Sequence, residues 1–87
     1  LMNINKLIAI VKNKLQAEII IQDLIIEDKS FLHKNHQGNQ EGKYHLKLTI
    51  KSNELAKSSK IASTKKVYDI LSVELKEYIH SIQILLN

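Results

Sequence analysis

The chain contains no cysteine and no arginine, and only two of its 87 residues are glycine. Without cysteine it forms no disulfide, offers no thiolate nucleophile and builds no metal site from thiolates. Imidazole or carboxylate groups would therefore have to hold any metal ion. All thirteen positive residues are lysine. The chain therefore cannot form the bidentate hydrogen bonds that arginine makes with guanine, and sequence-specific recognition of base pairs is disfavoured.

Sequence motifs of catalytic sites are also missing. The run GNQEG (38–42) is not followed by the Lys-Ser/Thr pair that completes a phosphate-binding loop, and no serine lies in a Gly-x-Ser-x-Gly turn. Glu27 and Asp28 are neighbours in a predicted strand and point to opposite faces, which is unsuitable for a paired acid and base. A domain of this length buries roughly 60–65% of its unfolded surface, which leaves little volume for a deep pocket. We expect a binding protein, not an enzyme.

The charge balance favours an anionic partner. The net charge is +4, which attracts nucleic acid or an acidic protein surface; the alternative is that codon bias toward lysine produces an ordinary solvated surface. No apolar run is long enough to span a bilayer, and the N-terminal residues lack the layout of a signal peptide. We therefore expect a soluble protein without a membrane partner, located in the cytoplasm, or in an organellar matrix if the source is eukaryotic.

The spacing of apolar residues predicts helices and strands in the order α-β-β-α-α-β. Helices repeat apolar residues every three or four positions, whereas half-buried strands alternate them. Ser63 is the predicted N-cap of the second long helix. The predicted elements are a helix over 3–17, a strand over 23–28, a strand over 43–51, a short helical turn within 52–59, a helix over 63–78 and a strand over 80–86.

This order predicts a single α+β domain over residues 1–87. A domain this small is expected to form one three-stranded mixed sheet with its helices on one face. The last two strands are joined through the second long helix, and such a crossover gives parallel pairing. A long loop, which contains both glycines, joins the first two strands as a hairpin.

Three of the four histidines lie within residues 30–45, between and at the start of these strands. Parallel pairing places His80, at the start of the last strand, at the same end of the sheet as the loop histidines His33 and His36. One interpretation is a metal site built from these three imidazoles. The alternative is that the loop histidines are simply solvated, and that His80, on the same side of its strand as Ile84, is a partly buried residue that closes the sheet.

The chain resembles the BolA-like protein family. The resemblance rests on DKSFLH (28–33), a long loop with glycine, YHLKLTIKS (44–52) and VYDILSVELKEYIHSIQI (67–84), in that order. It extends from about Leu7 to Ile84 and implies a small class II KH-like fold, in agreement with the predicted order of elements. The alternation of the strand places His45 on its polar face among lysines, where an ordinary solvated or hydrogen-bonded histidine is expected.

The resemblance further implies a function in iron-sulfur trafficking or iron sensing. Members pair with a monothiol (CGFS) glutaredoxin and co-ligate a [2Fe-2S] cluster that is shared with the glutaredoxin and glutathione. The implied ligands are His80 and His33, with His36 as the alternate loop ligand, and imidazole ligation of such a cluster occurs in Rieske centres. We expect no cofactor in the isolated chain, which would be a monomer alone and a heterodimer with its partner.

Two other functions remain open. The family also suggests a KH-like DNA-binding regulator of stress response and cell morphology, in which Lys57, Lys60, Lys65 and Lys66 would grip phosphates with little sequence preference. Against this, the chain lacks a GxxG loop and has few aromatic residues for base stacking, and residues 63–65 read Ser-Thr-Lys where bacterial relatives often carry Arg-His-Arg. The third reading is a protein interaction module that binds no metal.

Overall fold

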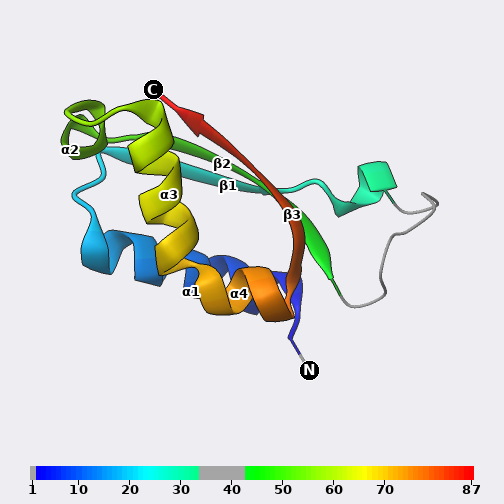
Figure 1. Cartoon of the computed structure of the whole chain (residues 1–87). Coiled ribbons are helices and arrows are strands. Elements are labelled where there is room, and N and C mark those ends of the chain that lie inside the picture. The colour runs from blue at the N-terminus through cyan, green and yellow to red at the C-terminus, as the bar shows by residue number, and fades with distance from the viewer. Residues whose placement is uncertain (1, 34–42) are drawn as a thin grey trace.

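The computed structural model describes residues 2–33 and 43–87 and shows one three-stranded sheet beside a layer of helices (Figure 1). The elements in chain order are α1 (Ile4–Glu18), β1 (Asp23–Asp28), the short 3-10 helix η1 (Ser30–His33), β2 (Tyr44–Lys51), α2 (Asn53–Ala56), α3 (Lys60–Ile70), α4 (Ser72–Glu77) and β3 (Ile79–Leu86). The glycine-containing loop predicted between the first two strands lies largely outside the described residues.

The sheet has the strand order β1-β2-β3. β1 and β2 are antiparallel and β2 and β3 are parallel, because the hairpin reverses the chain between the first pair and the helical crossover returns it between the second pair. Helices α1, α3 and α4 lie below one face of the sheet, and the opposite face is left open (Figure 1). The predicted α+β fold class and the mixed sheet are therefore confirmed.

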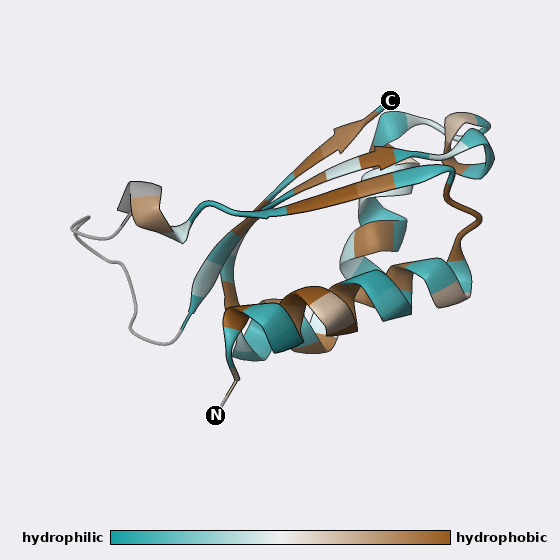
Figure 2. Cartoon of the chain, turned by 180° about the vertical axis from the view of Figure 1, so that it is seen from behind, coloured by the Kyte–Doolittle hydropathy of each residue, from teal (hydrophilic) through white to brown (hydrophobic). Residues whose placement is uncertain are grey.

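The core lies between the sheet and α1. Asn3 caps this helix by accepting a hydrogen bond from the backbone N–H of Lys6 at 2.8 Å, and Leu7, Val11 and Leu15 recur at helical spacing and are fully buried. Figure 2 shows hydrophobic residues recurring along α1 and running through the strands above it. The remaining buried hydrophobic residues are Ile19, Leu46, Leu48, Ile50, Leu55, Val67, Leu71 and Ile79.

The predicted start of the second long helix at Ser63 is wrong. Ser59 is the N-cap of α3 and accepts the backbone N–H of Ala62 at 3.1 Å. Ser63 lies one turn inside the helix, is buried, and donates its hydroxyl to the carbonyl of Leu55 at 2.9 Å. Several serines precede this helix, and each has the side chain of a cap, so sequence alone does not say which of them begins it.

The predicted single helix over 63–78 is also divided in the structure. Leu71 has φ −98° and ψ 17°, which interrupts the helix between α3 and α4. The residue is fully buried, so the apolar spacing continues across the break. The break is therefore invisible to an argument from periodicity.

Among the helices of the described segments, none is both long enough and apolar enough to cross a bilayer.

Replacing Ser59 with alanine should lower the free energy of unfolding by about 1 kcal/mol, because the N–H of Ala62 loses its capping oxygen. Ser58 is the matched control, since it is exposed and is not the cap of α3. Urea unfolding of the two alanine variants measures the difference. Equal losses in the two variants would show that Ser59 does not cap the helix.

Candidate functional site

A β-bulge at the start of β3 displays His80. Tyr44 of β2 pairs with Ile79, but the next residue, His45, pairs with Ser81, so His80 is an extra residue with no partner on β2. Bulges of this kind re-aim side chains and are common beside functional sites. Ile79 is buried at 2% exposure, whereas His80 and Ser81 are both exposed. The reading of His80 as a partly buried residue is wrong, because it assumed unbroken alternation along the strand.

His45 lies directly against this bulge. Its ring centroid is 4.9 Å from that of His80, with the two planes tilted by 58°. Its Nδ1 and the hydroxyl oxygen of Ser81 are 2.7 Å apart and share a hydrogen bond. The side chain is only 5% exposed, so the prediction of a hydrogen-bonded histidine is confirmed and that of a solvated one is wrong. Neighbours on β3 cover it, and residue type alone gave no signal of that burial.

The backbone of His45 also anchors the segment that follows β1. Its carbonyl accepts the N–H of Lys29 at 2.7 Å, and its N–H donates to the hydroxyl oxygen of Ser30 at 3.0 Å. Ser30 in turn donates its hydroxyl and its N–H to a carboxylate oxygen of Asp28, at 2.5 and 3.0 Å. His45 therefore connects Ser30, the first residue of η1, with the bulge at His80. Ser30 and His80 are 50 residues apart in the sequence.

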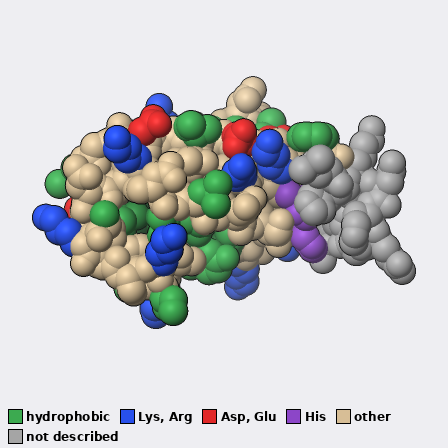
Figure 3. Space-filling view, turned by 90° about the horizontal axis from the view of Figure 1, so that it is seen from above, with side chains coloured by type: hydrophobic (Ala, Val, Ile, Leu, Met, Phe, Trp, Pro, Cys, Tyr) green, Lys and Arg blue, Asp and Glu red, His purple; other side chains and the backbone are tan. Residues whose placement is uncertain are grey.

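Of the predicted metal ligands, the structure describes the side chain of His80 alone. The backbone of His33 ends η1 at the same end of the sheet as His80, whereas the side chain of His33 and all of His36 lie outside what the structure describes. Figure 3 shows the described histidine side chains together at this end of the open face. Within the described segments no group of three or more histidine, aspartate or glutamate side chains could hold a metal ion.

A hollow of about 330 Å³ adjoins the histidines on the open face of the sheet. His45 and Ser81 form part of its wall, and Lys29, Lys47 and Gln83 complete much of the rest. The two lysines beside the imidazole of His45 give this hollow a positive character that favours an anionic ligand or protein surface. The analysis of the sequence did not single out Lys29 or Lys47, because their position beside His45 depends on how separate segments of the chain pack together.

The four lysines proposed for phosphate contacts all lie, exposed, around α2 and α3. Lys65 pairs with Asp69 at 3.0 Å, and Lys66 pairs with Glu54 at 3.2 Å. Among the described residues, Lys57 and Lys60 form no ion pair within the same distance limit. Of these four lysines, Lys57 and Lys60, at the corner between α2 and α3, are therefore the two whose charge is not offset by an ion pair with a described residue.

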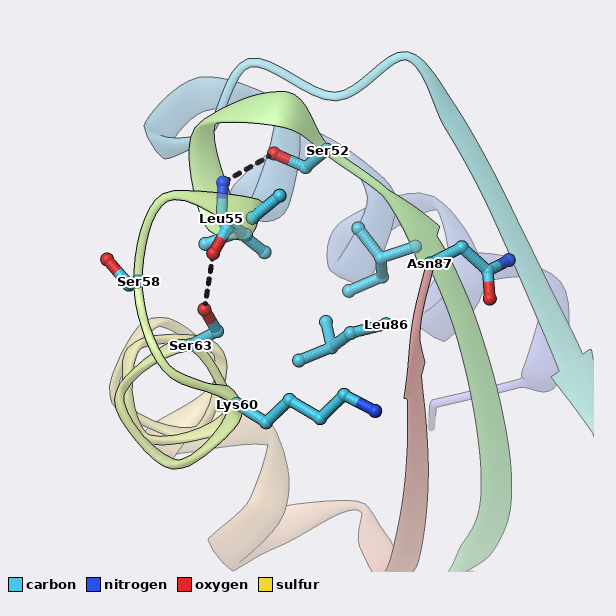
Figure 4. Close-up of a pocket in the computed structure, with 9 residues that line it drawn as sticks. Ser52, Leu55, Ser58, Lys60, Ser63, Leu86 and Asn87 are labelled. Atoms are coloured by element: carbon cyan, nitrogen blue, oxygen red, sulfur yellow. Dashed lines mark hydrogen bonds between the residues drawn. The ribbon is translucent and has the colours of Figure 1, made fainter.

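Lys60 also borders a cavity of about 290 Å³ between this corner and the last residues of β2 and β3 (Figure 4). The inner wall is apolar and includes Leu55 and Leu86. Ser52 and Ser63, which also line it, use their hydroxyls on the backbone of Leu55, at 3.1 and 2.9 Å. The side chain of Lys60 extends along the cavity with its ammonium group toward the β3 side, so an apolar cleft is combined with one cation.

Lys66 holds the pKa of Glu54 below its ordinary value of 4.5, through a hydrogen bond to the carboxylate, with a further contribution from the backbone N–H of Ile20. Because the folded pKa is depressed, the associated stability is present above the unfolded pKa and is lost as pH falls through the lower, folded pKa. Replacing Lys66 with alanine should raise the pKa of Glu54 in an NMR titration. An unchanged value would show that Lys66 is not the cause.

These features define a class: a small α+β domain with a mixed three-stranded sheet and an exposed histidine in a bulge on its parallel edge strand. The family model described as BolA-like protein matches residues 15–87. The chain therefore belongs to the BolA-like protein family, as its resemblance indicated.

The individual similarities support the same assignment. The chain is 30% identical over 73 residues to the DNA-binding transcriptional regulator BolA of Haemophilus influenzae, a match that spans 84% of this chain and 68% of that protein. Among solved structures it is similar to the BolA domain of SufE1 from Arabidopsis thaliana, with 26% identity, a TM-score of 0.77 and coverage of 100% of this chain and 94% of that one. BolA1 from the same plant gives 27% identity, a TM-score of 0.77 and coverage of 91% and 87%.

Proposed function

We propose that the chain is an adaptor that binds a monothiol CGFS glutaredoxin and co-ligates a shared [2Fe-2S] cluster in iron-sulfur trafficking or iron sensing. The observation that carries this proposal is the exposed imidazole of His80, presented by a bulge on a rigid strand and packed against a buried second imidazole. His33 is the proposed loop ligand and His36 the alternate. Glutathione and the cysteine of the glutaredoxin would complete the ligand set.

The residues present suit this role. Imidazole nitrogen is a known ligand of [2Fe-2S] iron, and when bound the cluster supplies one-electron chemistry and iron and sulfide for transfer. Ligating histidines are usually oriented by a neighbouring group. Here the ring of His45, fixed by Ser81, packs against His80 at a centroid distance of 4.9 Å and restricts the orientations that the exposed ring adopts.

The charge around the histidines supports the same partner. Glutathione carries two carboxylates, and the hollow beside His45 is bordered by Lys29 and Lys47. Lys29 is partly offset by Glu27 at 3.6 Å, whereas Lys47 has no ion pair among the described residues. An anionic partner is therefore attracted to the end of the sheet at which His80 is exposed.

Anaerobic reconstitution tests the proposal. The purified chain is mixed with a CGFS glutaredoxin, glutathione, iron and sulfide, and the visible absorption and circular dichroism are compared with those of the glutaredoxin alone. The expected result is a heterodimer with a spectrum different from that of the glutaredoxin's own cluster. A spectrum identical to that of the glutaredoxin alone, with no heterodimer, would reject the adaptor function.

A second candidate function is DNA binding, and the cavity beside Lys60 is the observation that favours it. An apolar cleft accepts the face of a base, and the adjacent ammonium group accepts a phosphate. The similarity to a protein named as a DNA-binding transcriptional regulator points the same way. This function does not use the histidines, so the two proposals are tested separately.

Fluorescence anisotropy with a single-stranded oligonucleotide tests this second candidate. Binding should weaken steeply with salt, and Lys60→Ala should reduce the slope of log K against log salt by about one unit. Lys12, exposed on α1, is the matched control and should leave the slope unchanged. No binding at low salt, or equal effects of the two substitutions, would remove the candidate.

A further inference from the structure

We propose that two copies of this chain associate by antiparallel pairing along the outer edge of β3. β3 is eight residues long and lies at the end of the strand order, with β2 on one side only. Within the described segments no other strand pairs with its outer side. An edge strand of this length presents backbone N–H and C=O groups that are ready to form hydrogen bonds with another extended strand.

The composition of β3 contrasts with that of the other edge strand. β1 carries Asp23, Glu27 and Asp28 within six residues, and charged residues on an edge strand discourage pairing with further strands. β3 has no charged residue and no proline over its whole length. The bulge at His80 disturbs only its first part, and the residues from Ser81 to Leu86 continue in regular register with β2.

A second copy suits this edge better than a strand of another composition. The chain as a whole is positively charged, with a net charge of +4, so two copies repel one another over much of their surface. β3 carries neither lysine nor a carboxylate, so two copies of this strand pair without placing like charges opposite one another. Because a two-fold axis brings the same surface of each copy together, a neutral strand is complementary to itself.

The pairing has a definite register if the two-fold axis passes beside Gln83, near the middle of the regular part of β3. Gln83 then faces Gln83 of the other copy, and its amide both donates and accepts a hydrogen bond. In this register Ser81 of one copy lies opposite Leu85 of the other copy on the open face. The pairing therefore covers Leu85, which is 39% exposed in the single chain. The two sheets join into one continuous sheet, with the helices of both copies on the same side.

This association bears on the proposed adaptor function without depending on it. The last strand also belongs to the surface proposed for the glutaredoxin, because His80 is one of its residues. Self-association and glutaredoxin binding are therefore expected to compete. The two proposals fail separately: the self-association experiment uses the chain alone, without iron, sulfide, glutathione or glutaredoxin.

Sedimentation velocity from micromolar to millimolar concentration tests the association, with Gln83→Lys as the disrupting variant. The wild-type chain should sediment as a monomer at low concentration and as a dimer at high concentration. Gln83→Lys places two like charges directly opposite one another and should weaken dimerisation at least about tenfold, which corresponds to ~1.4 kcal/mol. Ile25→Lys is the matched control, because Ile25 is exposed on the other edge strand, and it should dimerise like the wild type.

Three results would overturn the proposal. The first is a wild-type chain that stays monomeric over the whole range. The second is a Gln83→Lys variant, folded by far-UV circular dichroism, that dimerises as the wild type does. The third is loss of the dimer in Ile25→Lys but not in Gln83→Lys, which would place the contact on β1.

Discussion

The variant His80→Ala should fail to form the mixed cluster with a CGFS glutaredoxin, while retaining the fold of the chain. His80 is exposed and is the extra residue of a bulge, so removing its ring leaves the hydrophobic core untouched. A cluster that loses one of its ligands should form at least about tenfold less, a loss comparable with that of removing a supporting residue at other metal sites. Visible circular dichroism after anaerobic reconstitution measures the loss.

Three variants sharpen this result. His80→Cys replaces one ligand with another and should restore a cluster with a shifted spectrum. Ser81→Ala should weaken the cluster less than His80→Ala, because it frees His45 to move but leaves the imidazole of His80 in place. The pair His33→Ala and His36→Ala identifies the loop ligand. If His80→Ala formed the wild-type cluster in wild-type yield, His80 would not be a ligand.

The second large effect is expected at the ion pair between α1 and α4. Lys14 approaches both carboxylate oxygens of Glu74, at 2.9 and 2.8 Å. The side chain of Glu74 is 5% exposed and that of Lys14 is 39% exposed. Lys14→Ala therefore leaves a buried carboxylate without its counter-charge and should lower the free energy of unfolding by about 2–3 kcal/mol, below the value for a fully buried pair because water reaches the lysine.

Urea unfolding of Lys14→Ala and Lys12→Ala tests this effect. Lys12 is exposed on the same helix, so its replacement should change stability by less than about 0.5 kcal/mol. The double variant Lys14→Met, Glu74→Leu removes both charges and should recover much of the loss. Equal destabilisation by the two single substitutions would show that the ion pair contributes little.

Most of the fold follows from patterns that are local in the sequence. β1 was predicted over the same residues as in the structure, and α1 and β2 within about one residue, because periodicity is a direct consequence of burying one face of an element. Parallel pairing of β2 and β3 followed from the crossover between them. The break at Leu71 could not be predicted, because buried residues continue on both sides of it.

The candidate site was predictable only in part. The topology correctly placed His80 at the end of the sheet where the loop begins. The exposure of both His80 and Ser81 reflects the one-residue shift of register between β2 and β3, and the burial of His45 depends on its neighbours on β3. A bulge is a property of two paired strands, and it cannot be predicted from the sequence of either strand alone. Lys29 and Lys47 line the hollow beside His45, a grouping that depends on the packing of segments distant in the sequence.

The central claim is that the imidazole of His80 is a ligand of the shared cluster. Pulsed electron paramagnetic resonance of the reduced mixed complex tests it most directly, with nitrogen-15 histidine in this chain and an unlabelled glutaredoxin. The prediction is a hyperfine coupling to histidine nitrogen that persists in His45→Ala and is lost or altered in His80→Cys, the variant expected to retain a cluster. A complex that shows no coupling to histidine nitrogen of this chain would contradict the claim.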